Sequence, residues 1–550
     1  MAIFDQIQFP FIFNSYRSPV FGRGGMVGAS QPLAVAAGLL ILEKGGNAVD
    51  AAVAVAAALN VTEPTSTGLG GDAFALIYEA KTRKVTALNG SGRAPANLTL
   101  ERLQREGYGE SLPMYHPYTI TVPGAAAAWF DIVERFGRLS LSQILAPAIK
   151  LAEEGFPVAP LTAHSWQHAA ETQLNRALNG KELTIDGRGP KPGEIFRNPG
   201  LARTLRALAE GGKNAYYRGP IAEAIAAIVQ EAGGCMTVED LAAHHSTWEE
   251  PISVTYRDMT IWECPPNGQG MAALLALNIL EGFDLQTYPP LSVSRLHIQI
   301  EAMRLAFADI RRYVADPAVR NVPVKELLNK TYAAERRKLI YPAQANPDIR
   351  FGVPTNTSDT VYFSVVDGEG NACSFINSNY YGFGTGIVPR GWGFSLQNRG
   401  HNFSLDPHHP NVVEPRKRPY HTIIPAMITR TSDQSLFASY GVMGGFMQPQ
   451  GHMQVAVNLV DDCLDPQTAL NQPRFCINAE YVNGQIALEE GIALQTMAEL
   501  AAMGHPIRPV TGMGRGLFGR GQVILRDPQS GVLCGGSDPR ADGCVMTLHG

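Results

Sequence analysis

The stretch Asp359-Thr360-Val361-Tyr362-Phe363-Ser364-Val365-Val366-Asp367 is the part of the sequence from which the rest of the fold can be argued. Apolar residues alternate along it, and this pattern predicts a strand with one buried face. A turn rich in Gly, Asp and Asn follows, and residues 372–378 predict a returning strand. If the hairpin is centred on Glu369, the numbers of paired residues sum to 738 (twice 369), which places Thr360 opposite Ser378 with Cβ atoms about 5 Å apart. We therefore expect two hydroxyl groups to face each other at the open end of this hairpin.

This pair of hydroxyls is unusual for a structural strand and natural for a nucleophile. A threonine hydroxyl is a weak nucleophile without a base, but a threonine at a chain end can use its own α-amine, whose unperturbed pKa is about 7.7–8. Thr360 is internal, so this chemistry requires cleavage of the Asp359–Thr360 bond, and residues 352–358 have the composition of a loop that can be cut. The alternative is that Thr360 only begins a strand, and this stretch alone leaves both interpretations open.

The composition of the whole chain limits the class of protein. Its 550 residues are 45% hydrophobic, enough for a large core, and the net charge is −5. No basic stripe predicts nucleic-acid binding, and the longest run of small apolar residues, 51–61, is too short to span a membrane. The first residues lack the basic start of a secretory signal, so we expect a cytoplasmic protein with no nucleic-acid or membrane partner.

Three groups of residues look like functional motifs but lack the context that such motifs need. The seven cysteines include no C-x-x-C pair, which favours free thiols over a disulfide framework or a zinc site. Residues 514–519 match a dinucleotide-binding pattern, but a strand rather than a helix is predicted after them. His408 and His409 lack partners at metal-ligand spacing. We therefore expect no metal and no cofactor.

The alanine-rich residues 30–60 predict two helices that pack tightly on a flat surface such as a sheet. Gly45-Gly46 break the pattern, and Asn47 can cap the second helix with Asp50 as its capping-box partner. The small, glycine-rich residues 65–72 come next. They either line a pocket or merely turn the chain, and the sequence leaves both open.

The predicted secondary structure changes from mostly helix to mostly strand near residue 360. Residues 100–345 show mostly helical periodicity, whereas the residues after 360 predict strands. The polar segment that ends at Asp359 is the best boundary. It divides the sequence into a helix-rich part, residues 1–359, and a strand-rich part, residues 360–550.

Short motifs follow one another along almost the whole chain. They are Gly45–Ala52, Gly68–Gly71, Val122–Gly124, Pro265–Asn267, Glu301–Arg304, Thr360 with Ser364–Asp367, Gly382–Ile387, Lys417–Pro419, Gly444-Gly445 and Ser537–Arg540. Together they resemble the γ-glutamyltransferase (γ-glutamyl transpeptidase) family of N-terminal-nucleophile hydrolases. Because so many motifs occur in one order, the resemblance favours Thr360 as a nucleophile over Thr360 as a plain strand start.

The resemblance implies an α/β (α+β) fold, the four-layer αββα sandwich. It also implies autocatalytic cleavage between Asp359 and Thr360, which yields a large subunit, 1–359, and a small subunit, 360–550, that stay together as one intertwined fold. Thr360 then attacks an amide carbonyl, with Ser378 as the neighbouring hydroxyl. Whether two such heterodimers associate is left open.

Gly444 and Gly445 stand where the oxyanion hole of this family lies. Two glycines before a helix can offer unobstructed N–H donors to a developing oxyanion, and a plain tight turn is the alternative. Release of the acyl group to water is hydrolysis, and its release to an amine is transpeptidation.

The positions that bind the α-carboxylate of a γ-glutamyl group differ from those of the family's glutamyl enzymes. Those enzymes use an arginine at the position that is Ser91 in this chain, two residues before Arg93. They also use a serine pair, which here reads His421-Thr422. His421 is either a pocket residue or a structural histidine, and the sequence does not decide between them.

The positions that bind the α-ammonium differ as well. The glutamyl enzymes have a carboxylate at the position of Asn402 and an amide at the position of Arg399. Tyr380 occupies a further position of this group. An asparagine cannot balance a buried ammonium, and an arginine repels it. The pocket therefore suits an acyl group without a free α-amine, with a negative end for Arg399, Arg93 or His421.

Three functions remain open. The first is a self-processing amide hydrolase or acyltransferase acting on a small-molecule amide with an anionic or non-glutamyl acyl group, since residues 441–450 are similar to the branch that includes oxamate amidohydrolase. The second is a true γ-glutamyltransferase or glutathione hydrolase with altered substrate contacts. The third is a processed but catalytically silent binding protein, against which the intact Thr360, Ser378, Gly444 and Gly445 argue.

Overall fold

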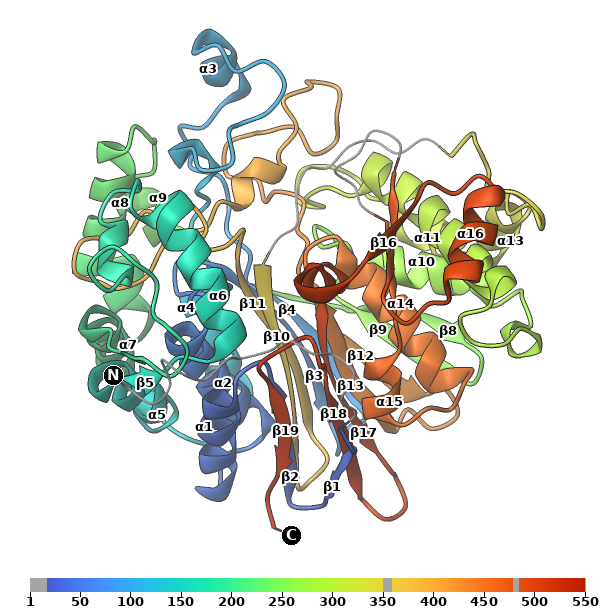
Figure 1. Ribbon diagram of the computed structural model, residues 1–550. Helices are drawn as coiled ribbons and strands as arrows, with labels where there is room; N and C mark the ends of the chain where they lie inside the picture. Colours follow the sequence, from blue (N-terminus) through green and yellow to red (C-terminus); the bar gives the residue numbers. More distant parts are fainter. Residues whose placement is uncertain (1–16, 350–358, 478–483, 550) are drawn as a thin grey trace.

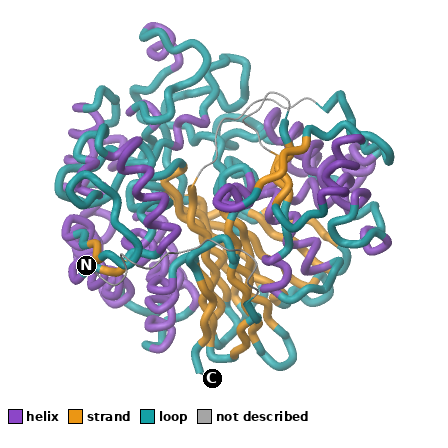
Figure 2. The backbone as a smooth tube through the Cα atoms, viewed as in Figure 1, coloured by secondary structure: helices purple, strands orange, loops and turns teal. Residues whose placement is uncertain are grey.

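Two seven-stranded sheets lie face to face through the centre of the molecule, and helices cover the outer face of each (Figure 1). The computed structural model describes residues 17–349, 359–477 and 484–549. Purple helices flank the orange strands on both sides in Figure 2. This order of helix, sheet, sheet and helix confirms the predicted four-layer sandwich.

The strands of the first sheet are, in spatial order, β1 (Val20–Gly22), β18 (Leu533–Ser537), β17 (Arg520–Arg526), β13 (Leu436–Met443), β12 (Ala426–Arg430), β9 (Met259–Glu263) and β8 (Ile252–Tyr256). Those of the second sheet are β19 (Cys544–Thr547), β2 (Gly25–Ala29), β10 (Asp359–Asp367), β11 (Ala372–Tyr380), β3 (Asp72–Glu79), β4 (Lys84–Asn89) and β7 (Thr247–Glu249). Two small sheets contain β14 (Phe475–Ile477), β15 (Ile486–Glu489) and β16 (Ile507–Val510), and β5 (Phe156–Pro157) with β6 (Ile195–Phe196).

The helices divide between the two outer layers (Figure 1). On the side of the second sheet lie α1 (Pro32–Glu43), α2 (Ala48–Thr62), α4 (Ala125–Phe136), α5 (Leu141–Glu154), α6 (Pro160–Ala169), α7 (Pro199–Tyr217), α8 (Pro220–Glu231) and α9 (Val238–Ala242), with α3 (Leu100–Arg105) at the top of the view. On the side of the first sheet lie α10 (Gly270–Leu280), α11 (Val293–Tyr313), α12 (Val324–Leu327), α13 (Lys330–Arg337), α14 (Met447–Val460), α15 (Pro466–Asn471) and α16 (Leu494–Ala502).

Both sheets mix strands from the two sides of the predicted boundary. β10 and β11 lie between β2 and β3, although residues 1–359 contribute β2 and β3. In the first sheet, β12 from the C-terminal part pairs with β9 from the N-terminal part. Neither part therefore forms either of the two seven-stranded sheets on its own.

The hairpin of β10 and β11 has the predicted register. Val361 pairs with Asn377, and the pairs continue in the same register to Val366 with Ala372. The register shifts between Asp359 and Val361, which places an irregularity at Thr360. Such irregularities redirect side chains, and here the affected residue is the predicted nucleophile.

The N-terminus of α2 carries the predicted capping box. The side chain of Asn47 accepts hydrogen bonds from the amides of Val49 (3.0 Å) and Asp50 (3.1 Å), and the Asp50 carboxylate accepts one from the Asn47 amide (3.0 Å). The cap fixes where α2 begins, and every residue of the helix is buried. α2 packs on β10 and β11, so it supports the strands that carry the hydroxyl pair.

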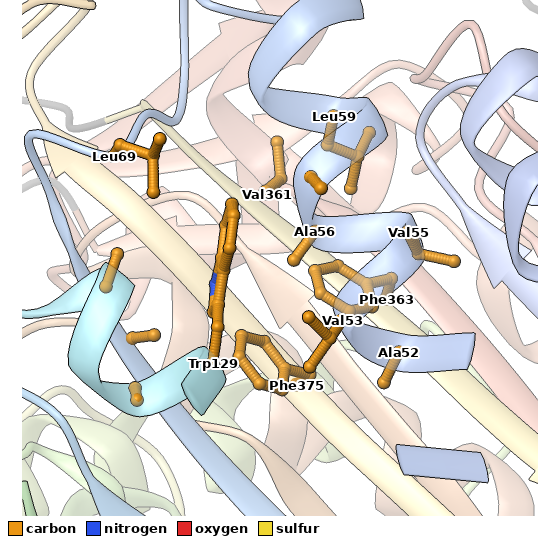
Figure 3. Close-up of a cluster of buried hydrophobic side chains, with 14 of the residues drawn as sticks. Ala52, Val53, Val55, Ala56, Leu59, Leu69, Trp129, Val361, Phe363 and Phe375 are labelled. Atoms are coloured by element: carbon orange, nitrogen blue, oxygen red, sulfur yellow. The ribbon is translucent and has the colours of Figure 1, made fainter. Parts of the chain in front are cut away.

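Apolar side chains fill the space between α2, α4 and the hairpin (Figure 3). The rings of Phe363 and Phe375 stack with centroids 5.1 Å apart, and both are fully buried. The indole of Trp129 lies beside them and donates a hydrogen bond to Asn377 Oδ1 (3.0 Å). This cluster fixes the position of the hairpin relative to the helices α2 and α4.

Phe363→Ala is expected to destabilise the protein by about 3–5 kcal/mol, because it removes a buried ring and leaves a cavity that the stacked neighbour cannot fill. Urea denaturation measures the change. Leu494→Ala is the control, since this side chain is 78% exposed and its loss should change stability by less than about 0.5 kcal/mol. Equal stability of the two variants would show that the cluster does not support the hairpin.

Candidate active site

The two predicted hydroxyls meet at the open end of the hairpin. Thr360 Oγ1 lies 3.1 Å from Ser378 Oγ, and both residues are fully buried. Ser378 Oγ also accepts a hydrogen bond from the backbone amide of Tyr380 (2.8 Å). Asp359 begins β10, and the loop residues 352–358 that precede the predicted cleavage site lie outside the described residues.

Arg399 connects this hydroxyl pair to the predicted substrate residues. Its Nη2 donates to Ser378 Oγ (3.1 Å), and its Nη1 donates to Thr422 Oγ1 (2.6 Å). The guanidinium carbon lies 4.3 Å from the ring centroid of Tyr380. The residue is fully buried, and burial lowers the pKa of Arg399 to about 10.

The charge of Arg399 has no carboxylate partner in contact with it. Among the described side chains, no carboxylate oxygen lies within 4 Å of the guanidinium, and Nε has no hydrogen-bond partner. A buried cation without a carboxylate in contact is costly, so the surroundings of Arg399 favour an anion.

Tyr380 and Asn402 continue the group of polar residues around Arg399. Tyr380 has a φ of +79°, an uncommon conformation for a non-glycine residue, at the end of β11. Its hydroxyl donates to Asn402 Oδ1 (2.7 Å), and Asn402 Nδ2 donates to the carbonyl of Tyr420 (3.1 Å). Both groups of Asn402 are thus engaged within the protein, and it offers no charge to an ammonium.

His421 bonds to a carboxylate that the sequence analysis did not single out. His421 Nε2 lies 2.9 Å from Asp72 Oδ2, and both side chains are fully buried. Burial, reinforced by the charge of Arg399, lowers the pKa of His421 to about 3, so the ring is neutral and donates a hydrogen bond rather than forming an ion pair. The only sequence signal for Asp72 is its place directly after a glycine-rich turn at a strand start.

Ser91 and Arg93 lie further from the hydroxyl pair. Ser91 Oγ donates to Asn89 Oδ1 (2.7 Å), in a polar group next to Asn267, whose carbonyl accepts from the His421 amide (2.9 Å). Arg93 is half-buried and donates to the carbonyl of residue 245 (3.3 Å). Of the predicted set, the structure therefore joins Arg399, Thr422, Tyr380 and Asn402 directly, and His421 and Ser91 through neighbours. In the described chain, Arg93 shares no hydrogen bond with any of them.

Gly444 and Gly445 form a turn between β13 and α14. Their φ values are +128° and +60°, and a Cβ on Gly444 would lie 3.1 Å from the Gly519 Cα. Within the described part of the chain, neither of their amides donates a hydrogen bond. Gln269, which the sequence analysis missed, donates both to the carbonyl of Thr422 (2.6 Å) and to that of Gly445 (2.8 Å), and so links this turn to Thr422.

His421 makes the stability of the fold depend on pH in a defined direction. Its pKa is about 3 in the folded protein and about 6.5 when exposed, so the unfolded state binds one more proton between these values. Its contribution to stability is complete above pH 6.5 and falls as the pH drops, by about 1.4 kcal/mol per pH unit. In urea denaturation at pH 7, 6 and 5, the free energy of unfolding of His421→Gln should fall less with decreasing pH than that of wild type. The difference should correspond to the uptake of one proton. Identical curves for the two proteins would contradict a buried neutral ring.

Neither metal ligands nor membrane helices appear in the described residues. No group of three or more His, Cys, Asp or Glu side chains there could hold a metal ion. No helix in residues 17–349, 359–477 or 484–549 is both long and apolar enough to cross a membrane. The seven cysteines are free thiols, and residues 512–518 form a 3-10 turn that leads into β17 rather than a helix, unlike a dinucleotide-binding motif.

Comparisons with known proteins agree with the resemblance seen in the sequence. Residues 34–548 match the family described as gamma-glutamyltranspeptidase. The chain is 37% identical to the glutathione hydrolase-like YwrD proenzyme of Bacillus subtilis (strain 168), over 96% of this chain and 99% of that protein. It is 33% identical to the oxamate amidohydrolase proenzyme of Klebsiella pneumoniae, over 95% of this chain and 98% of that protein.

A solved structure extends the match to the fold. The crystal structure of cephalosporin acylase from Bacillus halodurans has a TM-score of 0.91 at 46% identity, and the comparison covers 100% of both chains. This chain therefore belongs to the gamma-glutamyltranspeptidase family and is an amide hydrolase of the N-terminal-nucleophile class.

Proposed function

We propose that this protein is a precursor that cuts itself between Asp359 and Thr360 and then hydrolyses or transfers the acyl group of a small amide. The observation that carries the proposal is the buried Thr360–Ser378 hydroxyl pair with the Arg399 guanidinium bonded to it. The relatives described above bear the name proenzyme, which supports a processing step.

In the mature protein the freed α-amine of Thr360 is the base. It accepts the proton of Oγ1 as this oxygen attacks the amide carbon, and it passes the proton to the departing nitrogen. The product is an ester between the acyl group and Thr360. Water or a second amine then attacks this ester, takes the acyl group and returns the proton to Thr360.

Two further groups assist this reaction. Ser378 Oγ lies within hydrogen-bond distance of Thr360 Oγ1 and orients it. The amides of Gly444 and Gly445 are the donors proposed for the oxyanion that forms on the carbonyl. The tie from Gln269 to the Gly445 carbonyl keeps that turn in place.

The two pieces should stay together after cleavage. A small subunit of residues 360–550 would retain the ladder hydrogen bonds of β10 with β2 and of β11 with β3, which join it to the large subunit, 1–359. Separation would also expose the apolar face of β10 and β11 that packs on α2.

The proposed substrate has an anionic acyl group without a free α-amine. Arg399 supplies a buried cation with an unpaired Nε–H, and Asn402 supplies no negative charge for an ammonium. Monoamides of short dicarboxylic acids, such as oxamate, have this chemistry. A γ-glutamyl substrate with other contacts and a silent binding protein remain the alternatives.

A substrate panel separates these three functions. Ammonia or aniline release is measured for oxamate, for the monoamides of longer dicarboxylic acids, for their methyl esters and for a γ-glutamyl anilide. Turnover of the anionic amides above that of their esters is expected. Preference for the γ-glutamyl anilide would favour the second function, and a cleaved chain that hydrolyses nothing would favour the third.

A further inference from the structure

A second buried charge lies beside the pocket, and the proposed reaction does not use it. Asp72 begins β3 and is fully buried. Its Oδ1 accepts hydrogen bonds from the amides of Gly92 (2.9 Å) and Gly124 (3.2 Å) and from Gln397 Nε2 (3.0 Å). Its Oδ2 accepts one from His421 Nε2 (2.9 Å). Both oxygens are therefore occupied as acceptors.

All four donors to Asp72 are neutral. Two are backbone amides, one is a side-chain amide, and the fourth is the imidazole of His421, whose pKa burial lowers to about 3. Within the described residues, no lysine or arginine nitrogen lies within 4 Å of the Asp72 carboxylate. Hydrogen bonds stabilise this carboxylate, but no cation touches it.

Among the described residues, Arg399 is a buried cation that, like Asp72, has no group of opposite charge in contact with it. It has no carboxylate in contact, yet the charge of Asp72 raises the pKa of the guanidinium and opposes the effect of burial. Gln397, two residues before Arg399, bonds to Asp72, and His421 bonds to Asp72 one residue before the Thr422 that Arg399 contacts. The two charges are thus linked through the neutral side chains of Gln397 and His421, which lie close to Arg399 and Thr422 in the sequence.

We propose that Asp72 is the counter-charge of Arg399 and determines how strongly the pocket selects an anionic acyl group. This inference rests on the proposed role of Arg399 in binding that group. A substrate anion on Arg399 is attracted by the guanidinium and repelled by Asp72, because charges in a buried region interact over several ångströms. Asp72 therefore stabilises the charged guanidinium while no anion is bound, and it weakens the binding of an anion to Arg399.

Asp72→Asn tests this directly. Asparagine keeps the size and the Oδ1 acceptor for Gly92, Gly124 and Gln397, but it has no charge. Its amide donates to His421 Nε2 once the ring carries its proton on Nδ1 instead. The measured quantity is the ratio of kcat/KM for a dicarboxylic acid monoamide to kcat/KM for its methyl ester. The ratio is expected to rise about tenfold, mainly through a lower KM for the anion. A merely structural role of Asp72 would lower both values and leave the ratio unchanged.

The matched control is Asp50→Asn. Asp50 is another fully buried aspartate that accepts backbone hydrogen bonds, at the other end of α2 from the pocket side. This variant should leave the anion-to-ester ratio within about twofold of wild type. An equal rise of the ratio in both variants would overturn the proposal.

A double variant keeps the test decisive if Asp72→Asn does not fold well. Arg399→Gln and Asp72→Asn each leave one buried charge alone, whereas the double variant removes both. The double variant should therefore unfold at a higher temperature than either single variant. Additive losses in thermal stability, or an unchanged ratio in a folded Asp72→Asn protein, would overturn the proposal. A wild-type enzyme with equal kcat/KM for the anionic amide and its methyl ester would instead overturn the proposed substrate class. The comparison of unfolding temperatures would still decide whether the charges of Asp72 and Arg399 are coupled.

Discussion

Thr360→Ala is expected to leave the chain uncut and to lower amide turnover by more than about 10⁴-fold, since it removes the oxygen that both reactions need. Among the described residues, the hydroxyl that bonds to Thr360 Oγ1 is Ser378 Oγ, at 3.1 Å. That serine is internal and has no α-amine of its own to act as base. It therefore should not replace the threonine.

Two comparison variants sharpen this result. Thr360→Ser keeps both a hydroxyl and, after cleavage, an α-amine, so it should be cut and should retain measurable turnover. Thr204→Ala removes another buried threonine hydroxyl, which lies in α7 and donates to the Trp392 carbonyl, and this variant should be cut and active like wild type. A Thr360→Ala protein that hydrolyses amides at more than a tenth of the wild-type rate would exclude Thr360 as the nucleophile.

Arg399→Gln is expected to lower kcat/KM for an anionic amide by about 100-fold relative to the methyl ester of the same amide. Hydrogen bonds to charged groups contribute about 1.5–3 kcal/mol, and a buried site adds the electrostatic attraction between the two charges. The measurement is the initial rate of ammonia release from both compounds with each enzyme. Loss of activity on both compounds by the same factor would point to the Arg399–Ser378 bond instead of substrate charge.

Arg399→Lys is the companion variant. Lysine keeps the positive charge but cannot donate to Ser378 and Thr422 at once with the fixed geometry of a guanidinium. It should retain part of the preference for anions and lose turnover on both substrates. An Arg399→Lys enzyme that resembles Arg399→Gln in its anion preference would show that hydrogen-bond geometry, and not charge, selects the substrate.

The parts of the fold that depend on neighbouring residues could be predicted from the sequence. The hairpin register followed from the centre of one turn, and Val361 does pair with Asn377. The capping box at Asn47 and Asp50 depends on residues three apart, and it is present. In both cases the interacting groups are held close by the local chain geometry.

The start of β12 shows a limit of reasoning from an apolar pattern. The observed β12 begins at Ala426, because Pro425 has no N–H to donate to a neighbouring strand. Thr422 is left outside the strand, where its hydroxyl accepts from Arg399. The apolar pattern alone could not show that the proline would set the strand start.

The long-range contacts of the site could not be predicted either. Asp72 bonds to His421 and to Gln397, which lie more than 300 residues away along the chain. Gln269 bonds to Thr422 and Gly445 from the start of α10. Only the packing of the two sheets brings these groups together, and the sequence left open whether His421 belongs to the pocket. Its bond to a buried carboxylate is a structural fact that the histidine alone does not reveal.

The intact mass of freshly purified wild-type protein tests the central claim most directly. Measured under denaturing conditions, it should show two species whose masses correspond to residues 1–359 and 360–550. A single species of 59.3 kDa that nevertheless hydrolyses amides at full rate would contradict the account, because an internal threonine has no free amine to activate its hydroxyl.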